Sequence, residues 1–411
     1  MEETAGVLLD FFIIFVLAKA AAEVFARLRQ PTVIGELLVG VAIGPHALRL
    51  IDVPLLDSHE GLSFVYEVMA ELGLVVLLFF VGLETRLDDL LRVGRRSLAV
   101  AVLGVALPFA LGTAFMASTG HPNTEALFVG AALVATSVGI TARVLRDLGV
   151  LASKEARIIL GAAVADDILA LLVLTAVTQM DQEGGVDVGE VVVTAAVAVA
   201  FVAFTALVGT RVVRRYSLHL ERLRIPNAPL AVALPLMLGL SAVAGELGLA
   251  GIIGAFLAGI MLAESREQLQ LERRAQPIYE FLVPFFFVLT GAKVDLGAFS
   301  EGGTIGLALV ITGLAVLGKL VGCGVGGYGL GRRSMLILGV GMVPRGEIGF
   351  VVASVALAQG AVAADVFSSV VFMSIATTLL VPPVLSMLYT GSPSRSDGSR
   401  PGKAGRTAAA S

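Results

Sequence analysis

Long apolar runs separated by short polar breaks occupy almost the whole chain. Each run is about 20 residues long, which is the length that an α-helix needs to cross the hydrocarbon core of a bilayer. The alternation therefore predicts an all-α polytopic membrane protein with about thirteen membrane-spanning helices. The predicted spans are 5–26, 32–48, 63–83, 97–117, 124–142, 156–180, 188–213, 226–245, 248–264, 276–292, 303–329, 334–358 and 364–390.

The composition excludes a soluble protein. Of the 411 residues, 57% are hydrophobic and 15% are charged, and the mean hydropathy is +0.92. The single cysteine, Cys323, excludes a disulfide framework. The four histidines form no metal-ligand cluster, and the sequence has no Walker motif or dinucleotide-binding fingerprint. We therefore expect no cofactor, no enzymatic activity and no nucleic-acid partner, and we expect any transport to be driven by an ion gradient.

Basic residues are sorted between the two sides of the predicted membrane. Most Lys and Arg residues lie in alternate loops, whereas the opposite loops hold only Arg49 and Lys293. Because basic loops stay in the cytoplasm, we expect a plasma-membrane protein with its N-terminus outside and its C-terminus in the cytoplasm. Residues 1–390 are expected to form a single transmembrane domain. Residues 391–411 are rich in Ser, Gly and Arg, so a disordered cytoplasmic tail is expected there.

Two adjacent acids, Asp166 and Asp167, lie near the middle of an apolar run that is long enough to cross the bilayer, 158–177. A charge at that depth costs roughly 2.5–3.5 kcal/mol and by default marks an ion or proton pathway. Adjacent carboxylates repel each other, so their protonation is coupled. Consecutive residues of a helix are about 100° apart, so one acid can bind a transported ion while the other pairs elsewhere. We expect a cation site here that exchanges the bound cation for protons. An intramembrane aspartyl protease would need its two aspartates on separate helices.

The span 334–358 carries the signs of an interrupted helix. Pro344 lies near its middle between two glycines, and proline removes a backbone donor. Arg345 and Glu347 lie at the same point. Unwound backbone at membrane depth is tolerated only inside protein or beside a cavity. The alternative is a simple proline kink with a structural Arg–Glu pair.

The span 124–142 is a second, weaker candidate for a break. Thr136 and Ser137 can satisfy carbonyl groups that leave a helix, although hydroxyls that cap their own helix would give the same pattern. The two candidate breaks lie in similar places of two similar blocks, 97–180 and 303–390. Interrupted segments in corresponding positions indicate a transport site built from an inverted repeat.

Two further charges lie within spans. Lys319 is more than halfway along its span, where an ammonium group must find a carboxylate, lose its proton or reach the interface. Pairing with one of the two aspartates is the preferred interpretation. Glu36 lies one turn inside its span, and a structural partner on another helix is favoured there.

Several segments, taken in order, resemble the monovalent cation:proton antiporters, the sodium/hydrogen exchanger superfamily that includes NapA, NhaA and the Kef systems. This resemblance implies an NhaA-like fold with two crossed broken helices, a core of 97–180 and 303–390, and a dimer scaffold of 5–83 and 188–292. It also implies elevator-type movement and a homodimer. The segments are RLRQPTVIGELLVGVAIGP (27–45), ELGLVVLLFFVGLE (71–84), ATSVGITARVL (135–145), GAAVADDILALLVL (161–174), GIIGAFLAGIML (251–262) and GMVPRGEIGF (341–350).

The resemblance also implies roles for residues and a class of exchange. Two aspartates with a core lysine are associated in this family with electrogenic exchange of two protons for one sodium ion. The double aspartate, together with the lack of a large nucleotide-binding domain, distinguishes the chain from Kef-type potassium systems. This favours Na⁺ or Li⁺ and leaves K⁺/H⁺ exchange open. The implied ion- and proton-binding residues are Asp167, Asp166, Thr136 and Ser137, and the implied charge-compensating residues are Lys319, Arg345 and Glu347.

Overall fold

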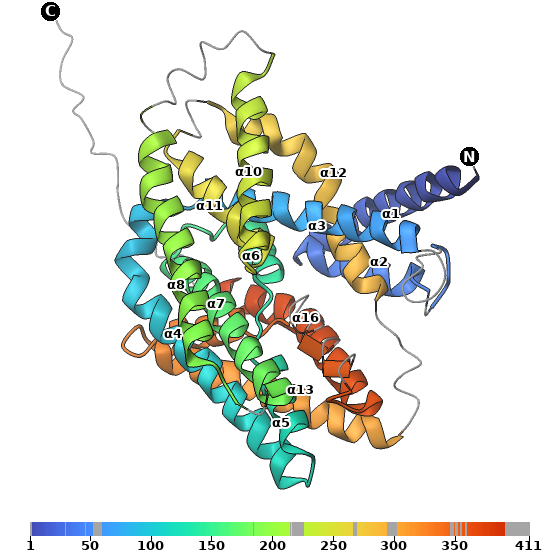
Figure 1. Cartoon of the computed structure of the whole chain (residues 1–411). Helices are drawn as coiled ribbons and strands as arrows, with labels where there is room; N and C mark the ends of the chain where they lie inside the picture. Colours follow the sequence, from blue (N-terminus) through green and yellow to red (C-terminus); the bar gives the residue numbers. More distant parts are fainter. Residues whose placement is uncertain are drawn as a thin grey trace, which may run out of the picture.

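The fold is known from a computed structural model, in which all regular structure of the described residues is helical (Figure 1). The helices are α1 (Glu2–Arg27), α2 (Thr32–Ile43), α3 (Glu60–Leu83), α4 (Leu87–Ser118), α5 (Asn123–Ala132), α6 (Val138–Asp147), α7 (Lys154–Glu183), α8 (Val188–Phe204), the π-helical turn η1 (Thr205–Gly209), α10 (Ala228–Glu246), α11 (Gly251–Ala263), α12 (Leu271–Ala292), α13 (Gly302–Gly326), α14 (Arg332–Gly341) and α16 (Ala364–Thr390). The described residues are 2–28, 30–45, 47–51, 60–183, 185–213, 215, 226–265, 269–293, 302–345, 349, 352–353, 356–357 and 360–390.

The described helices confirm an all-α polytopic fold. Among the described residues, nine segments are long and apolar enough to cross a membrane, namely α1, α3, α4, α7, α8 with η1, α10, α12, α13 and α16. The helices α2 and α11 are apolar but shorter. The remaining predicted spans, 124–142 and 334–358, fall on α5 with α6 and on α14 with the residues after it.

Two predicted boundaries were wrong, each for a local reason. The helix α4 begins at Leu87, well before the predicted start at 97, and Asp88 and Asp89 in its first turn suit the positive end of the helix dipole. The helix α2 ends at Ile43 rather than near residue 48, because Gly44 and a proline follow and the helix cannot continue through them.

The helices form two packing groups, with α6 between them. One group contains α4, α5, α7, α13, α14 and α16, and the other contains α1, α2, α3, α10, α11 and α12. The helix α6 contacts α7 and α16 of the first group and α2 and α3 of the second, and Figure 1 shows it near the centre of the molecule. That the first group is a moving core and the second a dimer scaffold stays a prediction.

Candidate functional site

The two adjacent acids of α7 face different surroundings. Asp166 has no exposed surface, and its Oδ1 accepts a hydrogen bond from Lys319 Nζ over 2.7 Å. Asp167 is 6% exposed and lines a cavity. This divergence follows from the helical turn of about 100° between consecutive residues. One acid therefore forms a buried ion pair, and its neighbour lies beside space that an ion or water can occupy.

Lys319 reaches Asp166 because α13 packs closely against α4. A Cβ atom added at Gly322 of α13 would lie 2.3 Å from the Leu103 carbonyl oxygen, so a larger residue cannot fit at that contact. On the facing helix, a Cβ at Gly104 would lie 3.6 Å from Lys319 Nζ. Small residues let membrane helices approach in this way. The lysine side chain therefore lies beside this close contact of α13 with α4, next to Gly104.

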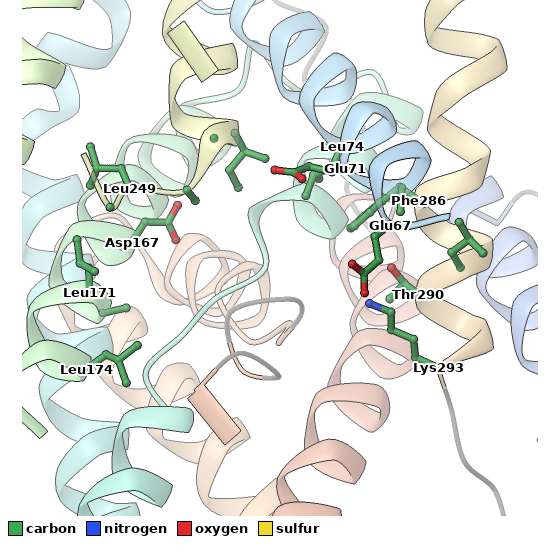
Figure 2. Close-up of a pocket in the computed structure, with 17 residues that line it drawn as sticks. Glu67, Glu71, Leu74, Asp167, Leu171, Leu174, Leu249, Phe286, Thr290 and Lys293 are labelled. Carbon is green, nitrogen blue, oxygen red and sulfur yellow. The ribbon is translucent and has the colours of Figure 1, made fainter. Parts of the chain in front are cut away.

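The cavity beside Asp167 has a volume of about 500 Å³. Figure 2 shows Asp167 of α7 on one wall, with Glu67 and Glu71 of α3 and Thr290 and Lys293 at the end of α12 on the facing wall. The rest of the lining is mainly apolar. Because these residues lie in the first half of α3 and the last turns of α12, the cavity lies toward the side of the fold where α3 begins and α12 ends.

The first break separates α5 from α6. The helix α5 ends at Ala132 and α6 begins at Val138, and the connecting residues include Thr136 and Ser137, both buried. In the second interrupted segment, α14 ends at Gly341. Its helical structure stops before Pro344, as the missing proline donor requires. Glu347 lies outside the described residues.

The first broken segment donates hydrogen bonds to the carbonyl groups at the end of α14. The Ser137 backbone N–H donates to Pro344 O over 2.7 Å. Thr136 Oγ1 donates to Met342 O over 3.3 Å, and Thr141 Oγ1 donates to Gly341 O over 2.7 Å. The last carbonyls of a helix have no partner within it, and burying them unpaired would be costly. The two breaks therefore meet and supply each other's missing partners.

Arg345 supplies the reciprocal contacts. Its guanidinium is fully buried, and Nη1 donates to Ala135 O over 2.7 Å while Nη2 donates to Leu133 O over 2.5 Å. These carbonyls follow the C-terminal end of α5, which carries the negative end of that half-helix dipole. Arg345 therefore places a fixed positive charge where the first broken helix ends.

Ser137 Oγ and Asp166 Oδ2 are buried and have no hydrogen-bond partner among the described residues. A small second cavity is lined by Val138, which follows Ser137, and by Asp167. In the described part of the chain, no group of three or more His, Cys, Asp or Glu side chains could hold a metal ion. Carboxylate, hydroxyl and backbone oxygens are therefore the available donors for a hard monovalent cation.

Comparison with known families identifies the chain. The family described as sodium/hydrogen exchanger, transmembrane, matches residues 12–390. The chain belongs to this family. The matched residues therefore include both interrupted segments and the acid pair.

Individual relatives agree with this membership. The high-affinity Na⁺/H⁺ antiporter NhaS3 of a Synechocystis species is 37% identical, with 94% of this chain and 90% of the relative covered. The Na⁺/H⁺-K⁺ antiporter GerN of Bacillus cereus is 36% identical, with 92% of this chain and 95% of the relative covered. The solved structure of the sodium proton antiporter MjNhaP1 from Methanocaldococcus jannaschii has a TM-score of 0.65 at 17% identity. That match covers 95% of this chain and 98% of the other, and it shows the exchanger fold.

One cluster in this exchanger was missed by sequence reasoning. Arg143 and Arg146 fall in the loop predicted between the spans 124–142 and 156–180, but both lie in α6, and their side chains are 10% and 15% exposed. Asp147 follows on the same helix and contacts Thr32 of α2. The helical spacing of the three charges, together with an acid inside the second span, could have indicated a shared buried interface.

Proposed function

We propose that this chain is a secondary active Na⁺/H⁺ antiporter, in which Na⁺ or Li⁺ competes with protons at Asp166 and Asp167. The observation that carries the proposal is the position of Asp167, which is nearly buried at mid-helix and yet lines the cavity. Membership of the exchanger family and the names of NhaS3 and GerN support the choice of ions. Thr136 and Ser137 would supply further oxygen ligands, and no resident cofactor is needed.

The proposed mechanism is alternating access by an elevator-type movement. Cation binding needs an ionised Asp167, so a proton that binds there displaces the cation. Asp166 is held by Lys319, and a proton or cation at this acid would release the amine. Exchange of two protons for one Na⁺ by such a pair would be electrogenic. The alternative is K⁺/H⁺ exchange of the Kef-like type, and the name of GerN, a Na⁺/H⁺-K⁺ antiporter, supports keeping it.

The proposed setting is the plasma membrane, with the N-terminus outside and the C-terminus in the cytoplasm. The distribution of basic loops supports this orientation. It would place the cavity of Figure 2 on the outer side. A homodimer built on the group that contains α1 and α12 is part of the same proposal, and the resemblance to dimeric antiporters supports it.

The test is ion exchange by the purified chain in proteoliposomes with a pH-sensitive dye inside. Na⁺ added outside should drive proton movement, and the apparent Na⁺ affinity should fall as the pH falls, because protons then occupy the carboxylates. Asp167→Asn should abolish exchange. Asp365→Asn, which removes an exposed carboxylate outside the cavity lining, should leave exchange unchanged. Full exchange by Asp167→Asn would refute the site, and exchange driven by K⁺ but not Na⁺ would favour the alternative.

A further inference from the structure

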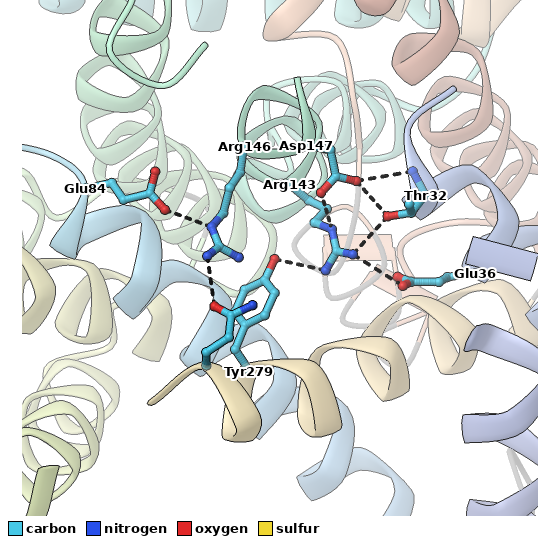
Figure 3. Close-up of polar contacts among 8 residues, drawn as sticks. Thr32, Glu36, Glu84, Arg143, Arg146, Asp147 and Tyr279 are labelled. Carbon is cyan, nitrogen blue, oxygen red and sulfur yellow. Dashed lines mark hydrogen bonds and ion pairs between the residues drawn. The ribbon is translucent and has the colours of Figure 1, made fainter. Parts of the chain in front are cut away.

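Arg143 connects α6 to the second packing group through three hydrogen bonds. Its Nη1 donates to Tyr279 Oη of α12 over 2.9 Å. Its Nη2 donates to Thr32 Oγ1 of α2 over 2.9 Å and lies 3.4 Å from Glu36 Oε1 of the same helix. Figure 3 shows the guanidinium between these partners. Glu36 is 1% exposed, so this is a buried charge pair that joins α6 to the second packing group.

Two neighbouring residues of α6 extend the same junction. Arg146 Nε donates to Glu84 Oε1, just beyond α3, over 2.9 Å, and its guanidinium carbon lies 4.1 Å from the centre of the Tyr279 ring. Asp147 Oδ2 accepts hydrogen bonds from the Thr32 hydroxyl and backbone N–H, over 2.7 Å and 3.2 Å, at the start of α2. We call this set the α6 latch; its members are Arg143, Arg146, Asp147, Thr32, Glu36, Glu84 and Tyr279 (Figure 3).

The latch and the cavity lie at opposite ends of the same helices. On α3, the cavity is lined by Glu67 to Leu74, whereas Glu84 follows the last residue of that helix. On α12, Tyr279 lies in the first half, whereas Thr290 and Lys293 line the cavity at its other end. On both α3 and α12, the cavity residues therefore lie toward one side of the membrane and the latch residues toward the other. The latch therefore closes the end of the junction that faces away from the cavity.

We propose that the α6 latch is the gate on the cytoplasmic side and that it opens whenever Asp167 becomes accessible from that side. The proposal rests on the proposed function in that it assumes alternating access to Asp167. The chemistry of the contacts suits a gate. The free energy of a buried ion pair is close to that of its separated, hydrated partners. The pair can therefore keep the gate closed and still allow it to open. An apolar seal would instead expose apolar surface to water at each opening.

The test uses two cysteine reporters in a Cys323→Ala background of the purified full chain. Leu78→Cys lies on α3 between the cavity residues and the latch, where Leu78 is 2% exposed. Leu74→Cys lies in the cavity lining. In Arg143→Gln or Glu36→Gln, opening of the gate should accelerate maleimide labelling of Leu78→Cys at least threefold and slow the labelling of Leu74→Cys. This readout needs no ion exchange, so it does not depend on the identity of the transported ion.

A matched control is available in the Arg157–Asp89 pair. Its atoms are 3.0 Å apart and join α7 to α4 within one packing group. Arg157→Gln should therefore change neither labelling rate. The proposal that the latch is a gate is overturned if Arg143→Gln also leaves both labelling rates unchanged. It is equally overturned if both reporters are labelled faster, because a general loosening of the fold would give that result.

A cross-link provides the converse measurement. Thr32 and Asp147 are in side-chain contact across the latch, so Thr32→Cys with Asp147→Cys should form a disulfide under oxidation. The oxidised protein should lose ion exchange, and reduction should restore it. Exchange at the full rate by fully cross-linked protein would overturn the gate. That outcome differs from a failure of the proposed site, which would be exchange without Asp167.

Discussion

Lys319 Nζ lies 2.7 Å from Asp166 Oδ1, and neither side chain has exposed surface. The pair joins α13 to α7, and it leaves Asp167 as the acid that lines the cavity. Neutralising one acid internally lowers the repulsion that two adjacent carboxylates would otherwise have at mid-membrane. The ion pair is thus both a structural contact and part of the electrostatics of the site.

Removing one partner of this pair should destabilise the protein more than removing both. Lys319→Gln leaves a buried carboxylate uncompensated, which costs roughly 3–5 kcal/mol. The double variant Lys319→Gln with Asp166→Asn should recover a large part of that loss, because no buried charge is left alone. Thermal unfolding in detergent of the two single variants and the double variant completes a double-mutant cycle. If the effects of the single variants simply add, the two residues are not coupled and the ion pair does not contribute as described.

The close contact of α13 with α4 should be needed for that ion pair. In Gly322→Ala, the new methyl group would lie 2.3 Å from the Leu103 carbonyl oxygen, so the helices must separate. Lys319 is one turn away and should be drawn from Asp166, which lowers both the melting temperature and the exchange rate. Gly313→Ala is the control on the same helix, because nothing lies within 4 Å of its new methyl group. Equal melting temperatures for the two variants would contradict the packing argument.

The second break should depend on Thr378 of α16. Its Oγ1 donates to Arg345 O over 2.7 Å, beyond the end of α14 at Gly341. Thr378→Val keeps the shape but removes the hydroxyl that donates to this carbonyl, at a cost of about 1–3 kcal/mol.

The control for Thr378→Val is Thr312→Val. Thr312 is also buried, but its hydroxyl donates to Ala308 O within its own helix, so its loss should cost less. The melting temperatures of the two variants in detergent provide the comparison. A larger loss in Thr312→Val would show that the carbonyl of Arg345 does not need the Thr378 hydroxyl.

Local chemistry made part of the fold predictable from sequence. Helix spans follow from apolar length, and the break after α14 follows from Pro344, because a missing backbone donor acts at its own position. The sequence did not indicate which of the two aspartates Lys319 contacts, because that depends on how α7 is rotated and how closely α13 approaches α4. The burial of Arg143 and Arg146 was also hidden. Counting charges in loops reports the side of the membrane and does not reveal whether another helix covers the charge.

The cavity wall opposite Asp167 contains charges that an approaching cation would meet first. Glu71 lies beside the start of α11, where a Cβ at Gly251 would be 3.8 Å from Glu71 Oε1. A negatively charged carboxylate at this position attracts cations into the cavity. Lys293 lies on the same cavity lining and opposes the attraction. Glu71 should therefore concentrate cations in the cavity without contacting the ion once it has reached Asp167.

Glu71→Gln should raise the KM for Na⁺ supplied from the cavity side by roughly twofold to fivefold at low ionic strength and leave kcat unchanged. Added salt with a cation that is not transported should shrink the difference, because ions screen exposed charges over about 8–10 Å. Lys293→Gln should shift KM in the opposite direction. The measurement is Na⁺-driven exchange in proteoliposomes at two ionic strengths, with Asp365→Asn as the control. A KM for Glu71→Gln that does not respond to salt, or a fall in kcat alone, would contradict electrostatic attraction and would instead indicate a structural role for Glu71.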